Sequence, residues 1–430
     1  MTDEEYMPLA VSDDVYYVEI NDESILPSFI QKNRTVKYGL FLVSGLMVLG
    51  LLYVMIILLP SLAPEGVQIP DIPMVRESNV YLHPIKPDKV KGKNPDPDDP
   101  VKIVPDFRSL PYLPASEPIL KKHLHKLSKT TDLSNKAKKK RLILIGDVHG
   151  CLKQLKKFLD YVKYDGGEED HVILLGDFTN KGPDSIGVIN FAIEQKLDCI
   201  LGNHELAMMK RYTQFHGLKS PTFVNNDEDT NSTLTMKESY DLDELMKLAK
   251  KITPEHLDFL SSCSPIKKIG PVPLYTNAKQ SRHASFPADG IAVHAGLLWN
   301  KDIYHQNIEE VTTIRNLLPP DWKIPTEDRH DQSGGKKSVA WTKIWNKHQL
   351  EIYNKDLEEI GDKALTIGTK VFYGHDAKRG VVTKQFSNGL DSGCVYGKQL
   401  TGVFIWSQIG SVNTEEEKIV YKQMTVSVNC

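Results

Sequence analysis

The 430-residue chain is poor in cysteine and carries no excess of positive charge. Its five cysteines form no CxxC pair and no dense framework, which excludes a cysteine-type zinc site and a fold that depends on disulfides. They leave room for one or two bridges in an oxidising compartment, with an odd thiol left over. A net charge of −3 argues against specific nucleic-acid binding, which usually needs a strongly basic domain. The chain also lacks a strand–GxGxxG–helix pattern and a GxxxxGK[ST] loop.

A long uncharged run, Tyr38–Leu59, predicts a single transmembrane helix. At 1.5 Å per residue it would span about 33 Å, close to the thickness of the bilayer core. A signal peptide would have a shorter apolar region nearer the N-terminus. Lys32, Arg34 and Lys37 come just before the run, and the next charges after it are acidic. The positive-inside rule therefore predicts a type II protein, with residues 1–37 as a cytosolic tail and the rest across the membrane.

Residues 60–140 are expected to form a spacer between the membrane and a globular domain. Residues 60–118 hold 13 of the 25 prolines, a density that disfavours helices. Residues 121–141 carry nine Lys or Arg against one Asp. This basic run is either a solvated linker, a clamp on anionic lipid headgroups, or a guide for a polyanionic substrate.

Residues 141–430 are predicted to form one large domain with mixed sheets and helices. The stretches RLILI, HVILL and DCIL read as strands, and the segments between them show helical periodicity. After Phe286 the strands GIAVHAG, KVFYGHD, GVVTKQF, GCVYG and TGVFIW look hairpin-like. The polar segment 217–240 reads as a surface loop, and it carries the sequon at Asn231, a predicted glycosylation site.

Potential metal ligands follow five apolar strands, each flanked by glycine. The motifs are GDVHG, GDFTN, GNHE, VHAG and YGHD. Aspartate, asparagine and histidine at several strand ends suit a pair of divalent ions, whose charge would attract phosphate and activate a water as a bridging hydroxide. Asp177 is expected to bridge both ions, and its companions are Asp147, His149, Asn203, His294 and His375. Zinc, manganese, cobalt and iron all fit these ligands.

This ordered set of motifs resembles the phosphoprotein-phosphatase branch of the calcineurin-like metallophosphatases. The resemblance covers residues 141 to about 410 and implies an α+β fold of two mixed sheets sandwiched between helices. It also implies the six metal ligands named above, with His204 of GNHE as the general acid that protonates the leaving oxygen.

One motif departs from the protein Ser/Thr phosphatases of that branch. Where they have GDxVDRG, this chain has Asn180 and Lys181. Asn180 can still orient His204, but it cannot stabilise an imidazolium as a carboxylate does. The following Gly182-Pro183 and the stretch GLDSGCVYGKQLTG resemble the dinucleoside-tetraphosphate hydrolases instead.

Together these features predict a hydrolase of phosphoanhydrides. The topology, the basic run and the motif subtype resemble the vacuolar zinc-dependent endopolyphosphatases of yeasts, which implies inorganic polyphosphate as substrate and a vacuolar location. Dinucleoside tetraphosphates and phosphoproteins are the alternative substrates, and a catalytically inactive binding protein is a third reading. Expected phosphate contacts are Lys181, Lys378 and Arg379.

Overall fold

The structure is a computed structural model that describes residues 33–58, 66–86, 106–225, 232–233, 244–274, 286–359, 364–411 and 417–430. The chain divides into one unit that ends at Glu65 and a second unit, Gly66–Cys430. Within the first unit, helix α2 (Arg34–Tyr53) continues into the short π-helical segment η1 (Val54–Leu58). Its length and composition would allow it to cross a membrane, and its described side chains are almost all exposed. It is a candidate membrane span.

Two mixed sheets form the centre of the second unit, as predicted. The first has the order β21 (Glu417–Asn429), β20 (Gln399–Ser411), β5 (Arg141–Ile145), β6 (Asp170–Leu174) and β7 (Asp198–Cys199). The second has the order β18 (Val382–Thr383), β19 (Ser387–Gly389), β17 (Thr369–Tyr373), β11 (Ala288–Val293), β10 (Ile266–Val272) and β2 (Val75–Glu77). In the first sheet, β5, β6 and β7 run parallel, while β20 is antiparallel to β5. In the second, β11 runs parallel to β17.

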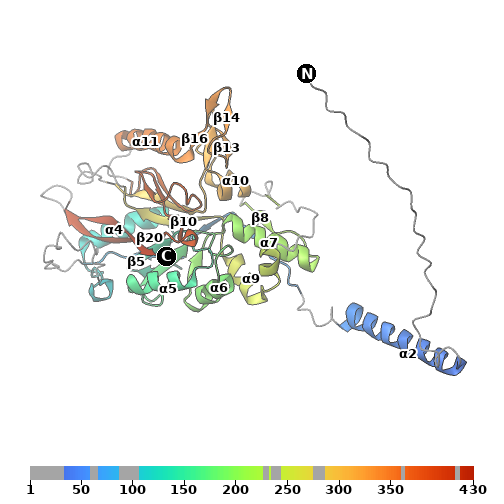
Figure 1. The fold of residues 1–430 in the computed structure, drawn as a ribbon. Helices are drawn as coiled ribbons and strands as arrows, with labels where there is room; N and C mark the ends of the chain where they lie inside the picture. Colours follow the sequence, from blue (N-terminus) through green and yellow to red (C-terminus); the bar gives the residue numbers. More distant parts are fainter. Residues whose placement is uncertain are drawn as a thin grey trace, which may run out of the picture. The chain divides into compact units, whose positions relative to one another are not determined.

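Helices cover the outer faces of these sheets (Figure 1). On one side α5 (Leu152–Tyr161), α6 (Ser185–Glu194) and α9 (Pro254–Ser262) lie next to one another. Leu155, Phe158 and Leu159 of α5 are buried, as their helical spacing predicts. On the other side α11 (Trp341–Glu359) packs against β19. The remaining helices of this part of the chain include α7 (Asn203–His216), α8 (Glu244–Ala249) and α10 (Ile308–Thr313).

Strand β5 is buried along its whole length, which includes a charged residue. The guanidinium of Arg141 donates to both carboxylate oxygens of Asp170 on β6, at 2.7 and 2.5 Å. A third bond goes from Arg141 to the carbonyl of Val162 at 2.9 Å. A buried arginine is tolerated here because these bidentate bonds satisfy its donors. The pair fixes β5 against β6 at the end opposite the predicted ligands.

The prediction that residues 60–140 form a spacer is wrong for the described parts of that range. Strand β1 (Ile72–Pro73) pairs with β8 (Thr222–Val224), β2 with β10, and β3 (Val80–Leu82) with β4 (Ala137–Lys139). Much of the basic run forms helix α4 (Pro118–Thr130), which buries Leu120, His123 and Leu127. These strands of two or three residues pair with distant segments, so they leave no periodic pattern in the sequence. The proline-rich KNPDPDDP stretch lies outside the described residues.

The strands after Phe286 form the expected hairpins only in part. Strand β18 pairs antiparallel with β19, and β20 pairs antiparallel with β21. Strands β11, β17 and β19 are parallel neighbours, and GCVYG forms the 3₁₀ turn η5 (Cys394–Tyr396). Residues 316–340 form a small projecting segment with strands β12 (Asn316–Leu318), β13 (Ile324–Thr326), β14 (Gln332–Ser333), β15 (Lys336–Lys337) and β16 (Val339–Ala340). This segment stands out next to α11 in Figure 1. Two disulfides, Cys199–Cys263 and Cys394–Cys430, leave Cys151 as a buried thiol.

Candidate functional site

The six predicted metal ligands lie together where five strands end. Asp147 and His149 follow β5, Asp177 follows β6, Asn203 begins α7 after β7, His294 follows β11 and His375 follows β17. Because parallel strands present their carboxyl ends at one edge of a sheet, these loops meet at a common place. They form the floor of a cavity of about 490 Å³, with His294 fully buried beneath it. We call these six residues the floor.

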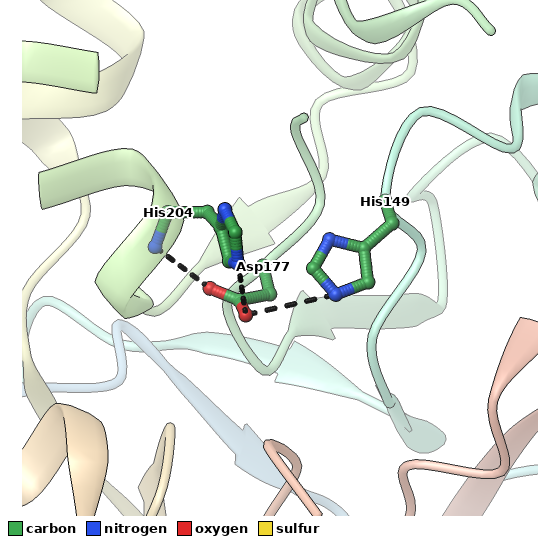
Figure 2. A group of neighbouring side chains, drawn as sticks. All are labelled: His149, Asp177 and His204. Carbon is green, nitrogen blue, oxygen red and sulfur yellow. Dashed lines mark hydrogen bonds and ion pairs between the residues drawn. The ribbon is translucent and has the colours of Figure 1, made fainter. Parts of the chain in front are cut away.

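Asp177 stands at the centre of the floor, as Figure 2 shows for two of its neighbours. Its Oδ2 lies 3.3 Å from Nε2 of His294, 3.7 Å from Nε2 of His149 and 3.8 Å from Nε2 of His204. Its Oδ1 accepts the backbone N–H of His204 at 3.0 Å. One carboxylate therefore reaches both groups of side chains that could hold an ion, His149–Asp177–His204 and Asp177–His294–His375.

Asn203 and Asp147 complete this arrangement from two sides. Oδ1 of Asn203 lies 3.1 Å from Nε2 of His294. Oδ1 of Asp147 accepts the backbone N–H of His375 at 3.0 Å, and its Oδ2 is 3.8 Å from Nε2 of His149. All six predicted residues thus belong to one connected cluster.

The histidines of the floor are oriented as metal ligands would be. Nδ1 of His149 donates to the carbonyl of Thr179 at 3.1 Å, and Nδ1 of His294 donates to that of Leu175 at 2.8 Å. His375 uses Nε2 for the same purpose, toward the carbonyl of Thr313 at 3.1 Å. Each ring therefore turns its other nitrogen inward. Although His294 is fully buried, the charge of Asp177 raises its pKa, so a cation at the floor would take the place of the proton on that inward nitrogen. The inward nitrogens of His294 and His375 lie 3.2 Å apart, and a cation between such lone pairs would stabilise both.

The carboxylates of the floor also indicate that a cation binds there. Burial, together with the charges of Asp391 and Asp177, raises the pKa of Asp147 well above its usual range. At Asp177 burial acts in that direction too, but the histidines around it outweigh burial and keep its pKa low. Buried carboxylates that face one another need either a proton or a cation. The donor set therefore fits one or more divalent ions, which Asp147, His149, Asp177, Asn203, His294 and His375 could hold.

His204 stands beside the floor, held by the residue that departs from the phosphatase motif. The amide nitrogen of Asn180 lies 2.8 Å from Nδ1 of His204. When this amide donates, Nδ1 carries no proton and Nε2 keeps one on the side of Asp177. Burial lowers the pKa of His204 to about 4, and the charge of Asp177 offsets this only in part. Asn180 thus orients the ring and favours its neutral form.

The backbone of these loops is unusual. Five of the eight non-glycine residues with positive φ in the described chain belong to this site: His149, Asp177, Asn180, Lys181 and His375. Each such residue costs about 1–3 kcal/mol and persists only where its surroundings fix it. Glycine is needed at two close approaches, because a Cβ on Gly202 would collide with Asp177 and one on Gly374 with Asp147.

Two acidic residues of the site were not among those predicted. Glu205 is fully buried and accepts hydrogen bonds from the backbone N–H groups of Asp177 at 2.7 Å, Thr179 at 3.0 Å and Gly202 at 3.0 Å. Burial and the charge of Asp177 raise its pKa to about 7. It positions the loop that carries Asp177. The sequence did contain a signal for Glu205. It follows His204 in GNHE and occupies the third position of a helix, where a glutamate side chain often caps the helix N-terminus.

Asp391 is the second, and it approaches the floor from the GLDSG turn. Its carboxylate accepts the backbone N–H of Gly393 at 3.0 Å, and its side chain is hydrogen-bonded to that of Asp147. Burial is the main cause of its raised pKa. The resemblance of GLDSGCVYGKQLTG to the dinucleoside-tetraphosphate hydrolases marked this turn, but it assigned no role to Asp391.

Five Lys or Arg side chains line the cavity above the floor, together with the acids Glu327 and Asp328. Arg329 is paired with Asp376, and Arg315 lies 3.5 Å from Glu327. We call the four cations other than Arg329 the rim: Lys181, Arg315, Lys378 and Lys398. Two of them, Lys181 and Lys378, are predicted phosphate contacts. The third predicted contact, Arg379, does not line the cavity. It pairs with Asp376 at 2.7 Å, binds the carbonyl of Arg315 at 3.0 Å and also contacts Asn316, so it braces the projecting segment. Asn231 lies outside the described residues.

Comparison with known proteins agrees with this geometry. The sequence profile described as calcineurin-like phosphoesterase matches residues 140–377, more than half of the chain. The chain belongs to the calcineurin-like phosphoesterase family. The predicted family and the predicted metal-dependent hydrolase are thereby confirmed.

Individual relatives have low sequence identity to this chain. The zinc-dependent endopolyphosphatase of Saccharomyces cerevisiae is 24% identical over 343 residues, which cover 79% of this chain and 90% of that protein. A symmetrical bis(5'-nucleosyl)-tetraphosphatase of Pseudomonas syringae pv. syringae is 24% identical and covers 60% of this chain and 86% of that protein. A crystal structure classified as a diadenosine tetraphosphatase is 27% identical, covers 68% of this chain and 94% of that chain, and superposes with a TM-score of 0.43.

Proposed function

We propose that this metallophosphoesterase cleaves inorganic polyphosphate at internal phosphoanhydride bonds. The observation that carries the proposal is the combination of a donor-rich floor with a rim of cations from separate loops. Lys181 follows β6, Arg315 follows α10, Lys378 follows β17 and Lys398 precedes β20. Cations spread around a mouth suit a substrate with many phosphates rather than a single phosphoryl group.

The chain's own residues suggest a division of labour. Divalent ions held by the floor, zinc by analogy with the yeast relative, would supply charge neutralisation and an activated water. Lys181, with Nζ 3.2 Å from Nε2 of His149, stands where it can bind a phosphate oxygen next to the floor. His204 would protonate the oxygen of the departing phosphate from Nε2, with Asn180 holding the ring in place.

Dinucleoside tetraphosphates are the second candidate, because relatives of that activity cover 60% of this chain. The described lining of the cavity argues against them. Its only Phe, Tyr or Trp is Tyr396, which is 63% exposed. Nucleotide bases are usually bound by stacking on aromatic faces, and two bases would need two such platforms.

A substrate comparison tests the proposal. The full chain in detergent, stripped of metal and reloaded with zinc, manganese or cobalt, is given long-chain polyphosphate, diadenosine tetraphosphate and a phosphopeptide. We expect the fastest turnover on polyphosphate, with products of intermediate length on a gel. Intact polyphosphate, together with rapid cleavage of either other substrate, would reject this assignment.

We also propose that helix α2–η1 anchors the protein and leaves residues 66–430 on the non-cytosolic side, in a vacuolar lumen. Two disulfides in the larger unit support an oxidising environment. The basic residues before the helix support the same orientation. In sealed vesicles from expressing cells, added protease should cleave the N-terminal tail and spare the larger unit, and glycosidase should change its mobility if Asn231 is glycosylated.

A further inference from the structure

A second cavity adjoins the first and shares Lys181 with it. It has a volume of about 500 Å³. One wall comes from the loop after β6 and the start of α6, and the other from α8 and the residues that follow it. Asn180, which holds His204, also lines this second cavity. The cavity therefore opens on the side of the floor where the expected proton donor stands.

The lysines of this second cavity outnumber its acidic residues, so positive charge remains to bind an anion. Three lysines line it, Lys181, Lys247 and Lys251, against two acids. Asp184 caps α6 by accepting the N–H of Gly187 at 2.8 Å, and Glu244 pairs with Lys247 at 2.6 Å. Both acids are thus engaged within the wall. Lys251 is exposed and has no acidic partner among the described residues.

We propose that this second cavity binds the phosphates of a polyphosphate chain that lie beyond the scissile bond on the leaving side. The inference rests on the proposed function and deepens it. A chain whose cleaved bond lies over the floor would pass Lys181, the residue common to both cavities, and meet Lys247 and Lys251. The rim cations would bind the phosphates on the opposite side of the cleaved bond, so the chain is held on both sides of that bond. Such a site reaches bonds inside a chain, whereas a one-sided site reaches only an end.

The test removes the two distal lysines from the full chain. The double variant Lys247→Ala, Lys251→Ala should lower kcat/KM for long-chain polyphosphate about three- to tenfold, since each is an exposed charge of modest strength. Its kcat/KM for tripolyphosphate should stay unchanged, because a three-phosphate substrate does not extend that far. The product ladder should shift from intermediate lengths toward end products.

Two further variants sharpen the test. The double variant Lys343→Ala, Lys347→Ala changes the net charge by the same amount on α11, where both lysines are exposed and outside both cavities. It should leave both substrates unaffected. Glu244→Gln releases Lys247 from its pair and should raise kcat/KM for the long chain. Equal losses in the two lysine pairs would show general charge attraction and overturn the proposal, as would unchanged long-chain turnover in the distal variant.

A binding arm separates this inference from the function on which it rests. Titration of polyphosphate into the full chain stripped of metal measures affinity without turnover, and the distal variant should bind several-fold more weakly than the wild type. If the wild type cleaves no polyphosphate, the proposed function fails, while a selective loss of binding in the distal variant would still support the second cavity. Equal affinity in the two proteins overturns it.

Discussion

The floor and the rim of the cavity differ in what holds their side chains. Five of the six floor residues are buried and Asn203 is half-buried; all follow apolar strands, and backbone carbonyls and N–H groups fix several of them. Lys181, Lys378 and Lys398 of the rim are exposed and lie on loops. Charges fixed in a buried site interact strongly, whereas exposed ones are weakened by water and salt. We expect the floor to determine which reaction occurs and the rim to determine which substrate is preferred.

Loss of the central carboxylate should have the largest effect. Asp177→Asn removes the group that reaches both halves of the floor, so turnover should fall more than about 100-fold, beyond the loss typical of a residue that only supports a ligand. Mass spectrometry of bound metal should show lower occupancy. Asp160→Asn, an exposed change on α5, serves as the matched control. Near-normal turnover with full metal content would place the ion-binding residues elsewhere.

Replacing the expected proton donor should cost somewhat less and depend on the leaving group. His204→Ala should slow hydrolysis of phenyl phosphate about 100-fold, within the range for general acids. The loss on p-nitrophenyl phosphate should be smaller, since nitrophenolate leaves without protonation. Bound metal should remain. Equal losses on the two substrates would assign His204 a role in holding an ion or shaping the floor.

The two disulfides lie beside different parts of the cavity, one next to the floor and the other next to the rim. Cys199 belongs to β7, which leads to Asn203, whereas Cys394 belongs to the turn between Asp391 and Lys398. Cys199→Ser/Cys263→Ser and Cys394→Ser/Cys430→Ser should each lower the free energy of unfolding in urea by about 2–5 kcal/mol. The first pair should then mainly reduce kcat, and the second should mainly raise KM. The same kinetic change in both would remove the distinction.

A single rim charge should have the smallest effect. Lys398→Ala should raise KM for polyphosphate about two- to fivefold with kcat retained, because an exposed ion pair contributes at most about 1 kcal/mol. Added salt should shrink the difference from wild type. Lys422→Ala, an exposed change on β21, is the control. A large fall in kcat would mean that Lys398 acts on the reacting phosphate itself.

The floor could be predicted from sequence because its signal is local. An apolar run followed by glycine and a metal-binding side chain marks each strand end, and parallel pairing brings the ends together. The two mixed sheets also followed from that pattern and the resemblance it carries. The strands of residues 66–86 were not predicted because they have only two or three residues and pair with distant segments. The strands of residues 316–340 are just as short, although they pair within the segment, so they show no periodic pattern either. The predicted phosphate contact of Arg379 was wrong because its partners come from other segments. The sequence does not show that the guanidinium binds Asp376 and the carbonyl of Arg315 in the folded chain.

The close approaches at Gly202 and Gly374 have a consequence for how such a protein can diversify. A single methyl group at either position would strike a carboxylate of the floor, so neither site tolerates even the smallest conventional replacement. Laboratory evolution toward new phosphate esters would therefore find its accepted changes in the loops around the mouth, while library members altered at these two glycines should drop out regardless of the substrate used for selection.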